Sequence, residues 1–206
     1  MVWHSVKFGI IAIKNKPEYL QSEHYVALAP GDGTIWYGDD EGEFGGNLMR
    51  IDMKSGEIYA VPDVENVTGM VKDPDRAGCI LASVGLAHFT GNGAILRFCG
   101  NSSEVVYKGD MPVWGLFANS DGVYALMQTG VVPIKNGKFV YSAEQKFKDM
   151  GMYKLNDIPV TQFGNVLFVY SGARGSDSVG GAGSPFVVTL PPGTKLKLTP
   201  VSKDQH

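Results

Sequence analysis

The sequence predicts an all-β protein, and within that class a β-propeller of about five four-stranded units. Turn-forming residues are frequent, with 27 glycines and 11 prolines among 206 residues, as folds made of many short strands require. Short runs of β-branched and aromatic residues alternate with these turns, which is typical of strands. The third observation is that one strand-and-turn pattern recurs along the chain at a nearly constant interval.

The clearest recurrence is between residues 2–15 and residues 123–136, which read VWHSVKFGIIAIKN and VYALMQTGVVPIKN. The two segments align without a gap and share their final Ile-Lys-Asn. Looser copies make five openings in all, at residues 2, 35, 80, 123 and 166, separated by 33, 45, 43 and 43 residues. This period is that of a propeller blade, which takes roughly 40–50 residues.

Each unit is predicted to run through an inner strand A, then strands B and C, and an outer strand D. The A strands carry small residues (Ala27, Gly69 and Gly115) that suit the crowded axis of a propeller, and tight turns lead from them into the B strands. Strands C are expected at 47–52, 94–98 and 185–188, and strands D at 57–61, 104–107, 138–141 and 195–199. Residues 1–206 are assigned to a single propeller domain.

The first unit lacks its A strand, because the chain starts at strand B. Two interpretations are open: a C-terminal segment supplies the missing strand and closes the ring, or the chain belongs to a larger propeller. An unclosed end would expose strand edges that pair readily with other chains. A near-complete five-bladed ring is the expectation.

Charge and hydropathy argue against two classes of partner. The net charge is −3 and the pI about 5.8, so no basic face is expected and nucleic acid is not a predicted partner. No apolar run approaches the roughly 20 residues that cross a bilayer, and the segment after Met1 lacks the pattern of a signal peptide. We therefore expect no membrane insertion, and the compartment stays open.

On these residues the repeat resembles two propeller families. The pattern carried best by residues 2–15 and 123–139 is similar to the repeats of two-component-regulator sensor propellers. The copy at 33–61, with Gly-Thr-Ile-Trp-Tyr followed by Arg-Ile-Asp-Met-Lys-Ser-Gly-Glu-Ile, is more similar to the repeats of virginiamycin B lyase-like propellers. The first likeness implies sensing or binding, and the second implies a lyase, each by analogy of fold.

Binding residues are expected on the B–C and D–A loops, which meet on one face of a propeller. The long B–C loops are predicted at 39–46, 86–93 and 172–183, and the D–A loops add Asp63, Glu65 and Asp110. The predicted ligand-binding residues are His24, Asp39, Asp40, His88, Trp114, Arg174 and Asp177. For Trp114 and Trp36, packing between blades is favoured over a platform on which a ligand stacks. The expected partner is a small molecule, a glycan or a protein.

A cation or catalytic site is the alternative use of the same loops. Asp39, Asp40 and Glu41 could bind a hard divalent cation through carboxylate oxygens. The lyase-like resemblance implies a histidine base beside glutamates, and His88, Glu41 and Glu43 fit those roles. The primary prediction is a non-catalytic binding or sensing module without a cofactor. A metal-assisted lyase or hydrolase, and an architectural module of a larger protein, are the alternatives.

Three local features complete the predictions. Cys79 begins a B strand and Cys99 ends the C strand of the same hairpin, so simple antiparallel pairing places them opposite each other. They are either bridged, in an oxidising compartment, or two buried thiols. Asn66 and Asn101 each begin a glycosylation sequon.

Overall fold

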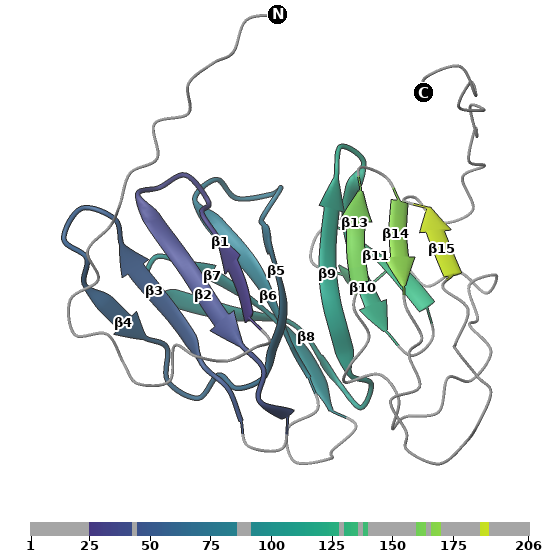
Figure 1. The fold of residues 1–206 in the computed structure, drawn as a ribbon, viewed down its shortest axis with the longest axis horizontal. Helices are drawn as coiled ribbons and strands as arrows, with labels where there is room; N and C mark the ends of the chain where they lie inside the picture. The colour runs from purple at the N-terminus through teal and green to yellow at the C-terminus, as the bar shows by residue number, and fades with distance from the viewer. Residues whose placement is uncertain are drawn as a thin grey trace, which may run out of the picture. The chain divides into compact units, whose positions relative to one another are not determined.

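A computed structural model describes eight ranges of the chain (Figure 1): 25–42, 45–85, 92–127, 130–135, 138–139, 160–163, 166–169 and 186–189. Within these ranges fifteen strands form antiparallel sheets, and no α-helix is present. The all-β prediction is therefore confirmed. The chain divides into two compact units, residues 1–116 and residues 117–206.

The first sheet is a sequential meander of four short strands. These are β1 (Tyr25–Leu28), β2 (Thr34–Asp39), β3 (Leu48–Asp52) and β4 (Ile58–Ala60), hydrogen-bonded in the order β1-β2-β3-β4. Aspartates build its turns: the carboxylate of Asp32 accepts the backbone N–H of Thr34 at 3.0 Å, and that of Asp52 accepts the N–H of Ser55 at 2.7 Å. Such side-chain-to-backbone bonds are why Asp marks turns in sequence.

The second sheet repeats this order with longer strands. It consists of β5 (Val67–Lys72), β6 (Cys79–Gly85), β7 (Gly93–Cys99) and β8 (Ser102–Gly109). The β6–β7 register runs from the pair of cysteines at one end to the pair Gly85 and Gly93 at the other. The register between β5 and β6 shifts near Gly69, so an irregularity interrupts the ladder of the predicted inner strand.

The remaining strands form two more meanders. One has the order β12-β11-β10-β9, with β9 (Val113–Asn119), β10 (Gly122–Met127), β11 (Gly130–Lys135) and β12 (Lys138–Phe139). The other is β13-β14-β15, with β13 (Val160–Phe163), β14 (Val166–Val169) and β15 (Phe186–Thr189). In the second unit the Gln162 side chain donates to the carbonyl of Ala118 at 2.7 Å, which ties β13 to β9.

The predicted A–B–C–D order holds in all three four-stranded sheets. The D strand predicted at 104–107 is longer in the structure and spans Ser102–Gly109. The turn between β7 and β8 consists of only two residues, Gly100 and Asn101, so β8 begins directly after it. The copy at 2–15 and the D strand at 195–199 lie outside the described residues. Closure of the sheets into a ring remains a prediction.

The core of the first unit joins its two sheets. Trp36 and Leu48 of the first sheet cluster with Val67, Ile80 and Phe98 of the second, and all five are nearly inaccessible to solvent. The rings of Trp36 and Phe98 lie 5.4 Å apart at a tilt of 38°. Burial of a side chain of this size stabilises the fold by about 1.5–3 kcal/mol. The packing role expected of Trp36 is confirmed.

Two glycines allow this close approach. A Cβ on Gly38 of β2 would lie 2.5 Å from a methyl carbon of Val67. A Cβ on Gly69 of β5 would lie 2.5 Å from the backbone nitrogen of Leu116 and 3.0 Å from the Cα of Gly115. The crowding expected around Gly69 and Gly115 is thus present within the first unit, whereas Ala27 is exposed.

We expect Gly69→Ala to destabilise the protein by about 1–3 kcal/mol, because its methyl group would overlap backbone that cannot rotate away. Urea denaturation followed by tryptophan fluorescence measures the change. The control is Ala60→Val, which enlarges an exposed position of β4 and should stay within about 0.5 kcal/mol. Equal effects of the two substitutions would contradict the close approach of the backbones.

Candidate functional site

A pocket lies at the loop end of the second sheet, where β6 and β8 end and where β5 and β7 begin. Its volume is about 390 Å³. Strand-end residues form its walls, and its charged or amide side chains are Glu65, Asn92, Lys108 and Asp110. Glu65 and Asp110 were expected to face this end from the D–A loops, and the structure places both in the wall of one pocket.

The neighbouring B–C loop of the first sheet is held by Asp39. Its side chain is fully buried, and one carboxylate oxygen accepts both the backbone N–H and the side-chain amide of Asn47. The backbone N–H of Asp39 donates to the carbonyl of Asn47 at 3.0 Å, so the two residues close the loop. Asp39 thus has a structural role here, which the sequence did not reveal because Asn47 is eight positions away.

Asn66 supports the same loop from the second sheet. Its backbone has a positive φ of 53°, and its side-chain amide donates to the carbonyl of Gly42 at 2.8 Å. The side chain is fully buried, so it is not exposed for glycosylation as its sequon suggested. The missed signal was the position of Asn66 immediately before a predicted A strand, where a residue that tolerates positive φ can end a turn.

Two acceptor atoms in this region have no hydrogen-bond partner: the second carboxylate oxygen of Asp39 and the amide oxygen of Asn66. Burial is the main cause that raises the pKa of Asp39. The hydrogen bonds from Asn47 oppose that shift, and the charges of Glu41 and Asp40 add to it. The buried carboxyl therefore favours its neutral form more than an exposed aspartate does.

Asp40 and Glu41, the other members of the predicted acidic cation site, have different surroundings. Asp40 accepts the N–H of Gly42 at 2.9 Å and shapes the loop, while Glu41 is exposed. In the described ranges no three His, Cys, Asp or Glu side chains come together in a group able to hold a metal ion.

Several predicted site residues lie outside the described residues. They are His24, Glu43, His88, Arg174 and Asp177. Trp114 is half-buried in β9, and its indole N–H is inaccessible and has no acceptor. Of the predicted ligand-binding set, the structure therefore places Asp39, Asp40 and Trp114 alone.

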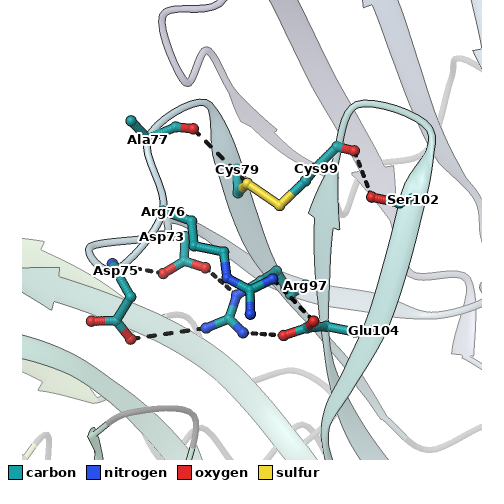
Figure 2. Close-up of a disulfide and its surroundings, with 9 residues drawn as sticks. All are labelled: Asp73, Asp75, Arg76, Ala77, Cys79, Arg97, Cys99, Ser102 and Glu104. Atoms are coloured by element: carbon teal, nitrogen blue, oxygen red, sulfur yellow. Dashed lines mark hydrogen bonds and ion pairs between the residues drawn. A yellow bond between two sulfur atoms is a disulfide. The ribbon is translucent and has the colours of Figure 1, made fainter.

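The opposite end of the second sheet is cross-linked (Figure 2). Cys79 and Cys99 face each other in the β6–β7 register and form a disulfide, with their Cα atoms 4.4 Å apart. The predicted register is confirmed, and of the two open alternatives the bridged form is observed. A bridge closing a loop of this length stabilises a fold by about 3 kcal/mol in chain-entropy terms.

An ion-pair network centred on the buried side chain of Arg97 lies beside the disulfide (Figure 2). Arg97 of β7 pairs with Asp73 and Glu104, and its guanidinium lies 3.9 Å from Asp75. Burial acts to lower the pKa of Arg97, but the hydrogen bonds to Asp73 and Glu104 outweigh it and raise the pKa. Hydrogen bonds from Arg97 and Arg76 lower the pKa of Glu104.

This ion-pair network was not predicted from the sequence. Its signal was an arginine inside the apolar strand 94–98, combined with the acidic Asp-Pro-Asp turn that begins at Asp73. Because Asp73 and Arg97 have fully or nearly fully buried side chains, the pair stabilises the turn end of the second sheet, which is the end that carries the disulfide, and is not accessible to a ligand.

No helix in the described part of the chain is long and apolar enough to cross a bilayer. No protein-family model matches the chain, and no curated protein matches it significantly.

Asp39→Asn should flatten the dependence of stability on pH. The raised pKa means that the folded state binds a proton at Asp39 more tightly than the unfolded chain, so its stabilising contribution is complete below the ordinary pKa and is lost as pH rises through the raised one. The wild-type free energy of unfolding should therefore fall from about pH 4 upward relative to the variant. Urea denaturation at a series of pH values measures this. Asp121→Asn, in an exposed turn, is the control, and an unchanged slope in Asp39→Asn would contradict the assignment.

Removal of the two neighbouring arginines should have unequal effects. Arg97→Ala leaves the Asp73 carboxylate buried without its cation, which costs about 3–5 kcal/mol. Arg76→Ala breaks an exposed ion pair, in which the side chains of Arg76 and Glu104 are 50% and 45% accessible. Its loss should lower the free energy of unfolding by about 0–1 kcal/mol. Chemical denaturation of both variants makes the comparison. Similar losses would show that Arg97 carries no buried charge pair.

Proposed function

We propose that the chain is a non-catalytic binding module, a single β-propeller domain that presents its B–C and D–A loop end to a ligand. Sequential four-stranded meanders with small residues at crowded inner-strand positions support the propeller architecture. The single observation that carries the binding role is the pocket at the loop end of the second sheet. Binding residues are commonly placed on loops held by a rigid scaffold.

The composition of this pocket favours binding over catalysis. Its wall combines one ammonium group, on Lys108, with carboxylates on Glu65 and Asp110, and among the described residues that line it none is a His, Cys, Ser, Thr or Tyr. Residues of those types are the usual nucleophiles and neutral-pH proton donors. The volume lies within the usual range for sites that take small molecules. A small polar molecule that carries both charge signs, such as an amino acid, fits the mixed charge of the wall.

The alternatives depend on other parts of the chain. A metal-assisted lyase or hydrolase would use His88 and Glu43, which lie outside the described residues, together with Glu41. An architectural module would need no ligand at the loop end at all. Both alternatives are distinguishable from a binding module in one experiment.

The test is a titration of ¹⁵N-labelled protein with free amino acids and with neutral monosaccharides, followed by NMR. We expect an amino acid to shift the amide signals of Glu65, Lys108 and Asp110 saturably, while its own spectrum shows no conversion to product. Lys108→Ala should weaken that binding about tenfold or more, since it removes a charged hydrogen-bond donor.

The matched control is Lys72→Ala, at the turn end of the same sheet, which should leave binding unchanged. Consumption of a compound would favour the enzyme. The absence of any saturable shift would favour the architectural module, and either result would overturn the proposal.

A further inference from the structure

A second cavity, of about 580 Å³, lies between the two sheets of the first unit. It is separate from the loop-end pocket, and the two share no lining residue. One wall is a row of side chains across the first sheet: Trp36 of β2 pairs with Arg50 of β3, which pairs with Tyr59 of β4. Paired residues of adjacent strands project on the same face of a sheet, so the three form a continuous surface.

The opposite wall comes from the second sheet. Leu96 and Phe98 are two positions apart on β7 and share one face, and Phe98 pairs with Ser103 of β8. The turn residues Gly100 and Asn101 close one side. A Cβ at Gly100 would lie 4.0 Å from a terminal nitrogen of Arg50, so the bare turn leaves room beside the guanidinium.

Arg50 is the distinctive group of this groove. Among the described residues none forms an ion pair with it, whereas Arg97 and Arg76 are both paired with carboxylates. Its guanidinium carbon lies 5.0 Å above the centre of the Tyr59 ring, and this cation–π contact holds the group in place. A fixed planar guanidinium with its donors unused is suited to bind a carboxylate through two parallel hydrogen bonds.

The rest of the groove is suited to an apolar ring. Trp36 and Phe98 lie buried beneath its base, and the half-buried Leu96 and Val61 supply the apolar surface that a ligand can reach. Tyr59 is 44% exposed at the mouth, and Asn101, Ser103 and Asp63 supply polar groups around the apolar base. An apolar cavity with a few placed polar groups is the usual form of a small-molecule site.

We propose that this inter-sheet groove binds an organic carboxylate with an apolar ring body, with Arg50 holding the carboxylate and the accessible side chains of Tyr59 and Leu96 contacting the ring. The site goes beyond the proposed function, since it uses neither the loop-end pocket nor its charged residues. It needs only the first unit's own pair of sheets.

Naphthalene-2-carboxylate is the probe, and 2-naphthalenemethanol is its uncharged analogue. We expect the carboxylate to cause saturable NMR shifts at Arg50, Tyr59, Phe98 and Asn101, with the amides of Lys108 and Asp110 unmoved. The analogue should bind about tenfold more weakly, because its neutral hydroxyl accepts a weaker hydrogen bond from the guanidinium and cannot form the two-point contact of a carboxylate. In Arg50→Gln the advantage of the carboxylate over the analogue should disappear.

The matched control is Arg76→Gln, which makes the same change of charge at an exposed, ion-paired arginine of the first unit and should leave the affinity unchanged. Thermal unfolding checks that each variant is folded. If Arg50→Gln is not, Arg50→Lys serves in its place and should lower affinity through loss of the two-point contact. Equal affinity for probe and analogue, or undiminished binding in the Arg50 variant, would overturn the proposal. Because the loop-end amides are followed in the same spectra, failure here leaves the proposed function untouched.

Discussion

The packing in the first unit depends on how closely its backbones can approach one another. At Gly69 the backbone of β5 comes so near to that of Gly115 and Leu116 that no side-chain carbon fits between them. At Gly38 the same is true of β2 and the Val67 side chain. Close packing of this kind fixes the position of each strand relative to its neighbour, since neither strand can shift without a clash.

The two ends of the second sheet use different means to stay in place. At the turn end, a disulfide and the buried Arg97–Asp73 pair join β6, β7 and the turn before β6. At the loop end, the neighbouring B–C loop is closed by hydrogen bonds of Asp39 and Asn66. Covalent and ionic cross-links tolerate little rearrangement, whereas single hydrogen bonds are each worth about 1 kcal/mol. The loop end carries the pocket.

Local patterns in the sequence were sufficient to predict the strands and their order, because β-forming runs and turn residues are legible without tertiary information. The opposition of Cys79 and Cys99 followed from counting outward from the centre of one hairpin loop, and the structure bears that out. The buried partners of Asp39 and Arg97 were not predictable in the same way. Asp39 reads as an exposed acidic loop residue, since its partner Asn47 and the covering Asn66 come close only after the sheets pack.

The groove at Arg50 escaped prediction for a related reason. Alternation along a strand tells which residues share a face, but it does not tell what the other sheet places opposite that face. Arg50 lies between Trp36 and Tyr59 in a row that would be ordinary on a solvated sheet. It becomes a candidate site because the facing sheet presents Phe98 and a bare glycine turn at the same level. A cation that the fold leaves unpaired beside an apolar cavity is unusual where the unit's other described arginines, Arg76 and Arg97, are paired. That contrast within one unit is the physical reason to look for an anion there.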